Sequence, residues 1–115
     1  MRLTKYINEN KKYFGYKIVH GLMKDMYVKS IYDGSLISLK KTYQNFPGAG
    51  LFLGTTKNFC LDYYSCKGEE GAKPEILLTY EFNINDVLKG YPEEKDGEVQ
   101  VSKAKLIKKE IVWDY

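Results

Sequence analysis

The middle of the chain reads Pro47-Gly48-Ala49-Gly50-Leu51-Phe52-Leu53-Gly54-Thr55-Thr56. The first four residues form a turn cluster, because proline and glycine interrupt regular structure. Leu51 to Leu53 make a short apolar strand, and the threonines after Gly54 offer a helix N-cap. The sequence therefore predicts a turn, a strand and a helix in close succession, with the helix over about residues 57–66.

Downstream of this stretch the chain is expected to be extended. Residues 68–73 are polar and contain two glycines, which is typical of an exposed loop. Residues 75–82 (Glu-Ile-Leu-Leu-Thr-Tyr-Glu-Phe) carry the strongest strand signal, and residues 85–90 indicate one capped helical turn. Alternation of polar and apolar residues then predicts a final strand pair, over 98–102 and 104–113.

Upstream, helical and extended patterns alternate. Residues 3–13 place apolar side chains at near-helical spacing, which predicts a short N-terminal helix. Residues 16–20 are β-rich and stop at Gly21, which predicts a strand. Residues 22–31 repeat apolar side chains at three and four positions, which predicts a second helix before Asp33-Gly34. The chain as a whole is expected to be a single α+β domain, residues 1–115, with a mostly antiparallel sheet.

Charge and cysteine content narrow the classes of function. The net charge is +3, from 18 basic and 15 acidic residues. This is well below the concentrated positive charge that a nucleic-acid-binding protein usually carries. The lysines at 40–41 and 103–109 are interpreted as a solvated surface. Cys60, Cys66 and a single histidine provide no zinc-ligand spacing, so no metal is expected.

Targeting signals are not evident in the sequence. The N-terminal residues contain no continuous apolar segment, and no apolar run approaches the ~20 residues that a membrane-spanning helix needs. We therefore expect a cytoplasmic protein with no membrane association, whose two thiols are reduced.

Three segments in order carry a resemblance to a known family. Residues 16–21 (Tyr-Lys-Ile-Val-His-Gly) resemble the first-strand motif of ADP-ribosyltransferases of the His-Tyr-Glu type. Residues 48–53 and the helix after them, up to Tyr63, are similar to that family's Gly-x-Gly-Ile-Tyr-Phe strand and Ser-x-x-Tyr helix. Residues 98–101 resemble the late strand that begins with the catalytic glutamate. The resemblance spans residues 16–112 and implies a split-sheet ADP-ribosyltransferase-like core.

The resemblance also implies roles for individual residues, with NAD as the substrate that supplies ADP-ribose. His20 would bond the adenosine ribose, and Gly21 would pair with the nicotinamide carboxamide. Phe52 and Tyr63 would stack on the nicotinamide ring, and Cys60 stands where a serine would meet the carboxamide. Glu98 would accept the ribose 2′-hydroxyl and stabilise the oxocarbenium-like state, so His20 and Glu98 are the expected catalytic residues.

Three departures from the family pattern leave two functions open. Leu22 replaces a Ser or Thr, Phe52 lacks a tyrosine hydroxyl, and Cys60 is a weaker hydrogen-bonding group than serine. The first function is a compact mono-ADP-ribosyltransferase of the toxin, phage host-takeover or anti-defence kind, whose macromolecular target is a protein rather than a nucleic acid. The second is a catalytically silent relative that binds and inhibits a protein partner.

Taken one at a time, the residue types of the candidate site often occur at such positions without any catalytic role. A histidine at a strand end, an apolar phenylalanine, a helical tyrosine and a glutamate on an edge strand each occur as packing or surface residues. A relative that handles RNA phosphates is disfavoured, because the second histidine and the arginine of such enzymes are missing and Arg2 is the only arginine.

Overall fold

A computed structural model describes residues 11–24, 26–32, 34–40, 42–67 and 74–114. In chain order, its elements are β1 (Lys12–His20), β2 (Tyr27–Ser30), β3 (Leu36–Ser38), β4 (Tyr43–Asn45), β5 (Leu51–Gly54), α2 (Lys57–Tyr63), β6 (Glu75–Asn83), a 3-10 turn (Ile84–Asp86), β7 (Val87–Lys89), β8 (Glu98–Val101) and β9 (Lys103–Trp113).

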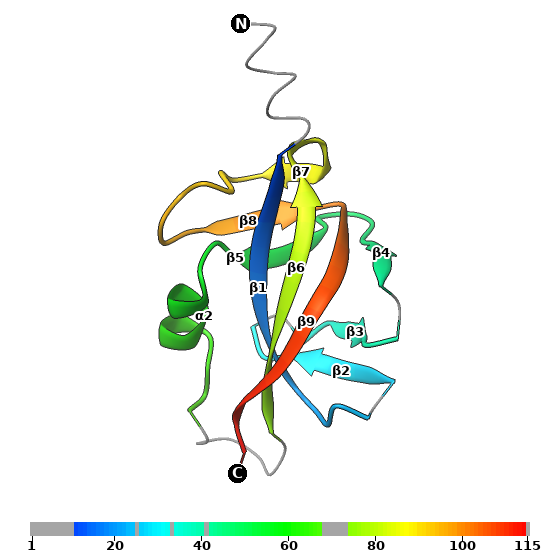
Figure 1. Cartoon of the computed structure of the whole chain (residues 1–115), viewed down its shortest axis with the longest axis vertical. Helices are drawn as coiled ribbons and strands as arrows, with labels where there is room; N and C mark the ends of the chain where they lie inside the picture. Colours follow the sequence, from blue (N-terminus) through cyan, green and yellow to red (C-terminus); the bar gives the residue numbers. More distant parts are fainter. Residues whose placement is uncertain (1–10, 25, 33, 41, 68–73, 115) are drawn as a thin grey trace, which may run out of the picture.

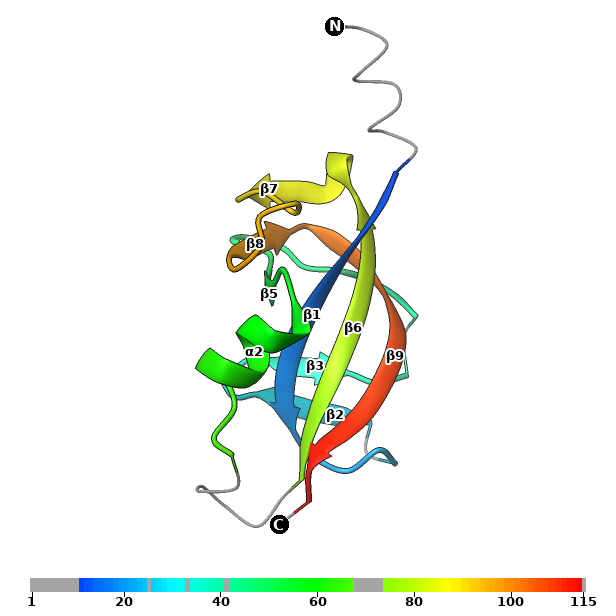
Figure 2. The same cartoon turned by 60° about the vertical axis from the view of Figure 1, so that its left-hand side comes forward.

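The strands form one curled, antiparallel sheet, and α2 lies beside β1 on one side of it (Figures 1 and 2). The strand order is β4-β9-β6-β1-β5-β8-β7, with β2 also paired to β1 and β3 paired to β2. The expectation of an α+β domain with a mostly antiparallel sheet is confirmed at this level. No helix among the described residues is long and apolar enough to cross a membrane.

Strands β1 and β6 form the centre of the sheet. They pair along nine consecutive positions, from Lys12↔Asn83 to His20↔Glu75. Six consecutive residues of β6, Glu75 to Tyr80, are buried, which explains the continuous apolar character of this segment. The predicted strands at 16–20 and 75–82 are confirmed, each as part of a longer strand.

Along the edge of β1 that does not face β6, two different strands are paired, and each begins a separate branch of the sheet. Tyr16 pairs with Gly54 of β5, whereas Val19 and His20 pair with Ser30 and Lys29 of β2. Beyond β5 lie β8 and β7, and beyond β2 lies β3. The sheet therefore divides at the middle of β1, between these two sets of pairs.

Two groups of buried side chains hold the sheet together. The larger one lies inside the curl of the sheet and includes Val19, Leu53, Leu78, Tyr80 and Val99. The smaller one comprises Ile18, Cys60 and Leu77, and it joins α2 to β1 and β6. Gly54 permits this contact, because a Cβ atom there would overlap the Cys60 sulfur.

The helix predicted over residues 22–31 is wrong. Tyr27–Ser30 forms β2, with Val28 and Ser30 buried and Tyr27 and Lys29 exposed, which is the two-residue alternation of a strand. Pairing with both β1 and β3 overrides the local helical spacing. The helix predicted over 3–13 is also wrong at its end, since Lys12 and Tyr13 belong to β1. The rest of that segment, residues 3–10, lies outside the described residues.

The other predicted elements are confirmed with adjusted bounds. The helix after Thr56 ends at Tyr63, and the Phe59 amide donates to Thr56 Oγ1 at 3.1 Å as an N-cap. The capped turn at 85–90 is a 3-10 turn that leads into β7, and the strands at 98–102 and 104–113 are β8 and β9. The predicted pairing of these two strands is wrong, because β8 pairs with β5 and β7 whereas β9 pairs with β4 and β6. The predicted loop 68–73 lies outside the described residues.

Candidate functional site

Three segments that are far apart in the sequence form adjacent strands. β5 lies between β1 and β8, and Tyr16, Gly54 and Glu98 are aligned in one row across the three. Phe52 is paired with Gln100 in the same way. Because paired residues point to one face and alternate along each strand, Phe52, Glu98 and Gln100 share the face opposite the main core.

A cluster of aromatic rings lies beside this face. The ring of Tyr32, just after β2, is 6.0 Å from the ring of Phe52 and 4.6 Å from that of Tyr64, measured between centroids. Tyr64 is the C-cap of α2, and its ring also meets Phe59 edge-on at 5.5 Å. Tyr32 therefore bridges the two branches of the divided sheet.

The carboxylate of Glu98 is held by this cluster. The Tyr64 hydroxyl donates a hydrogen bond of 2.8 Å to Glu98 Oε2. Burial raises the pKa of Tyr64 well above its ordinary value, and the hydrogen bond to the Glu98 carboxylate and its negative charge raise it further. Tyr64 is therefore a neutral donor that orients the Glu98 side chain.

A buried cation lies close to the same rings. Lys17 of β1 is only 3% exposed, and its ammonium donates to the carbonyl oxygen of Phe52 at 2.8 Å. The ammonium also lies 5.8 Å from the centroid of the Tyr32 ring, within range of a cation–π interaction. Lys17 thus links β1, β5 and Tyr32 at the place where the sheet divides.

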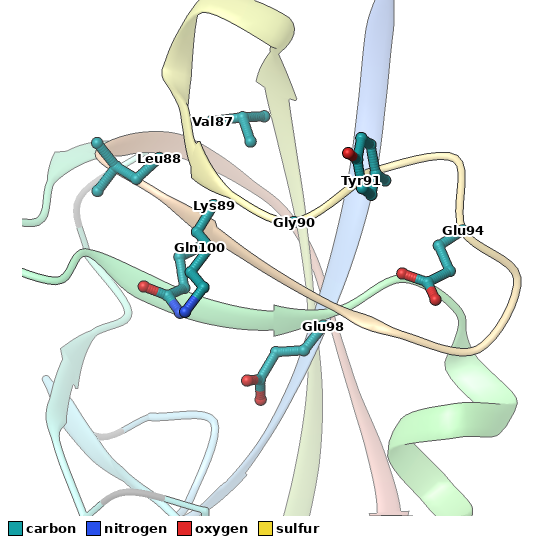
Figure 3. Close-up of a pocket in the computed structure, with 8 residues that line it drawn as sticks. All are labelled: Val87, Leu88, Lys89, Gly90, Tyr91, Glu94, Glu98 and Gln100. Carbon is teal, nitrogen blue, oxygen red and sulfur yellow. The ribbon is translucent and has the colours of Figure 1, made fainter.

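Glu98 also lines an open hollow of about 680 Å³ (Figure 3). β7, the loop after it and β8 form the walls. The lining combines two carboxylates, Glu94 and Glu98, with the amide of Gln100, the cation of Lys89 and the exposed ring of Tyr91. Glu98 therefore both bonds to the aromatic cluster and lines a polar hollow that is open to a second molecule.

His20 and Gly21 lie further along β1. His20 is four residues beyond Tyr16, which places it about 13 Å along the strand from the row that contains Glu98. It is paired in register with Glu75, a fully buried carboxylate that accepts a hydrogen bond of 2.6 Å from Ser65. The Gly21 amide donates to the Pro74 carbonyl at 3.1 Å, so this amide is engaged within the protein.

The thiol of Cys60 is part of the packing under α2. The side chain is fully buried, and its sulfur lies 3.2 Å from the carbonyl oxygen of Tyr16. Burial raises the pKa of Cys60 to about 12, so the thiol is neutral at physiological pH. In this position, Cys60 ties the helix to β1.

Tyr63 and Tyr64 have different environments. Tyr63 is 72% exposed and contacts Phe59, whereas Tyr64 contacts Tyr32 and Glu98. Sequence reasoning chose Tyr63 for the site and missed the role of its neighbour. The signal was present: Tyr64 follows Cys60 by four residues, so both lie on the buried face of the helix.

Lys17 and Tyr32 were also missed. A lysine inside an apolar strand segment, Tyr-Lys-Ile-Val, was a usable signal, because buried lysines are rare unless they have partners. Tyr32 could not be found in this way, since its position depends on the pairing of β2 with β1.

Among the described residues, no three His, Cys, Asp or Glu side chains gather in a manner that could hold a metal ion. Comparison with protein-family models, with curated proteins and with solved structures found no match to this chain.

Proposed function

We propose that the chain is an NAD-dependent mono-ADP-ribosyltransferase that modifies a macromolecular target, a protein rather than a nucleic acid. One observation carries the proposal. The three segments that resemble the family motifs form the adjacent strands β1, β5 and β8, which places Glu98 on one face with Phe52. Such an arrangement brings a carboxylate and an aromatic platform together from positions 46 residues apart in the sequence.

The chemistry assigns a role to each group. NAD would bind with its nicotinamide ring among the aromatic side chains, and Glu98 would accept the ribose 2′-hydroxyl. The bond between the ribose C1′ and the nicotinamide nitrogen breaks, nicotinamide leaves, and a nucleophile of the target forms the new bond to C1′ and loses its proton. The negative charge of Glu98 stabilises the oxocarbenium-like state between these events.

The acceptor would approach Glu98 from the hollow between β7 and β8. This hollow is open and Tyr64 does not line it, so the donor and the acceptor would reach Glu98 through different surfaces. His20 would contact the adenosine ribose at the far end of β1, consistent with a long dinucleotide that extends along this strand.

A second candidate, a catalytically silent module that inhibits a protein partner, is favoured by a different observation. The Tyr32 ring already contacts both Phe52 and Tyr64, where the proposed nicotinamide would stack. The Gly21 amide is bonded to Pro74, and Leu22 offers no hydroxyl. For a transferase, Tyr32 must move aside when NAD binds; for a silent module, it would fill the site permanently.

Two measurements separate these functions. Millimolar NAD should raise the melting temperature of a transferase, because a ligand that binds the native state stabilises it by RT ln(1 + [L]/Kd). Incubation with labelled NAD and lysate of a host cell should then label a protein band. An unchanged melting temperature together with an unlabelled lysate would reject the transferase and leave the silent module.

A further inference from the structure

We propose that the sheet edge formed by β4 and β9 binds single-stranded nucleic acid. The surface, here called the lysine face, consists of Lys40, Tyr43, Lys103, Lys105, Lys108 and Lys109. It lies on the edge of the sheet formed by β4 and β9, whereas Glu98 is on β8 on the other side of β1 (Figure 1). The proposal is independent of the transferase function.

The basic residues are brought together by strand pairing. Tyr43 of β4 is paired in register with Lys105 of β9, and the ammonium groups of Lys103 and Lys105 lie 5.1 and 5.6 Å from the centroid of its ring. Lys40, Lys108 and Lys109 line one hollow of about 220 Å³ next to them. Five lysines from two chain segments therefore lie along this edge of the sheet.

Most of this positive charge is not neutralised within the protein. In the described part of the chain, no carboxylate forms an ion pair with Lys40, Lys103, Lys105 or Lys109, although Glu81 is opposite Lys105 in register. Lys108 lies 3.9 Å from Glu110, but that carboxylate is bonded more closely, at 2.9 Å, to Lys57. An anionic partner would supply the missing counter-charges.

The exposed ring of Tyr43 indicates which kind of anionic partner fits this surface. Tyr43 is 55% exposed beside Lys103 and Lys105, and an exposed ring next to cations is the arrangement that stacks an unpaired base while the cations contact phosphates. In a double helix the faces of the bases are stacked on each other and cannot contact Tyr43. An acidic protein offers carboxylates to the lysines but has no base beside each charge that could stack on the ring. The geometry thus favours a single strand over a duplex or an acidic polypeptide.

The test uses a fluorescently labelled 12-nucleotide single-stranded RNA and the full chain. Anisotropy titrations at several salt concentrations should give binding that weakens with salt, since each phosphate contact contributes about 0.7 to the slope of log K against log salt. The variant Lys103→Ala/Lys105→Ala/Lys109→Ala should reduce that slope by about 2.

A matched control removes the same charge elsewhere. Lys24→Ala/Lys29→Ala/Lys95→Ala alters three exposed lysines outside the lysine face and should leave the slope unchanged. Tyr43→Ala should weaken binding about tenfold, whereas Tyr43→Phe, which keeps the ring, should not. Far-ultraviolet circular dichroism of each variant verifies that it is folded.

Three results would overturn the proposal. One is absence of salt-dependent RNA binding by the wild-type chain. Another is an equal effect of the two triple variants, which would mean that net charge alone governs binding. The third is tighter binding of a labelled poly-glutamate peptide than of RNA, which would assign the lysine face to an acidic protein.

Discussion

The phenol of Tyr64 and the carboxylate of Glu98 are joined by a hydrogen bond of 2.8 Å between α2 and β8. The bond couples the aromatic cluster to the residue on which the proposed chemistry depends. The helix that carries Tyr64 is short, but the packing of Cys60 against β1 fixes its position.

Glu98→Gln should separate binding from chemistry. The amide keeps the size and hydrogen-bonding reach of the carboxylate but removes its negative charge. We expect NAD affinity to change little and transfer of labelled ADP-ribose to fall on the order of a hundredfold or more. Glu94→Gln, in the same hollow, is the matched control and should retain most activity. A fully active Glu98→Gln protein would remove Glu98 from the mechanism.

Tyr64→Phe and Tyr80→Phe should have different effects on the free energy of unfolding. Tyr64→Phe loses the bond to Glu98 and should cost about 1 kcal/mol. Among the described residues the buried Tyr80 hydroxyl has no hydrogen-bond partner, so its removal should be neutral or stabilising. Urea unfolding at pH 7 measures both. Equal losses in the two variants would contradict these assignments.

Alkaline pH should destabilise the protein through the same two phenols. Burial raises the pKa of Tyr80 and of Tyr64 above the ordinary value of 10.0, so the unfolded chain releases these protons first. Their contribution to stability is complete below about pH 10 and declines as the pH rises through the folded-state pKa values.

The measurement is a series of urea unfolding curves from pH 8 to pH 11. Tyr80→Phe should flatten the alkaline loss, by up to about 1.4 kcal/mol per pH unit, relative to the wild type. Lysines titrate in the same range, so the difference between variant and wild type is the informative quantity. Identical slopes would show that Tyr80 titrates normally in the folded protein.

Tyr32→Ala should make the aromatic cluster accessible. The variant loses two ring contacts that a nicotinamide would otherwise have to displace, and each such contact contributes about 0.5–1.5 kcal/mol. If the chain is a transferase, NAD affinity measured by calorimetry should rise about tenfold. Tyr27→Ala, at another exposed tyrosine, is the control. Weaker NAD binding in Tyr32→Ala would mean that Tyr32 itself contacts the ligand.

The two cysteines should differ sharply in reactivity. Cys60 is fully buried with a pKa raised to about 12, whereas Cys66 is only partly buried. At pH 8, a thiol reagent such as 5,5′-dithiobis(2-nitrobenzoic acid) should modify Cys66 within minutes and Cys60 only after urea is added. Mass spectrometry of the native reaction checks the site. Rapid modification of Cys60 would show that α2 detaches readily from the sheet.

Much of the sheet could be predicted from local patterns. The strands around Leu77, Phe52 and Val99 stand out because apolar runs and alternation are properties of a few consecutive residues. The segment before Ile31 was misread, since its apolar spacing fits a helix and only pairing with β1 and β3 makes it a strand.

The candidate site was harder to predict than the strands. Phe52 and Glu98 could be selected because each lies within a short sequence motif. The alternation of side chains along a strand then predicts the face of the sheet to which each of them points. Tyr32 and Lys17 join them only through the register of distant strands, which no local pattern encodes. Tyr64 was missed because the motif spacing pointed to Tyr63, while helical periodicity from Cys60 pointed to its neighbour.

The long pairing of β1 with β6 has a consequence for biosynthesis. The partners in this ladder are roughly 55 to 70 residues apart, so the first strand leaves the ribosome long before its main partner is made. Until β6 emerges, the apolar side chains of β1 stay uncovered and available to chaperones or to other nascent chains. A truncated product that stops before residue 75 lacks the central ladder and should be degraded rather than accumulate as a folded fragment.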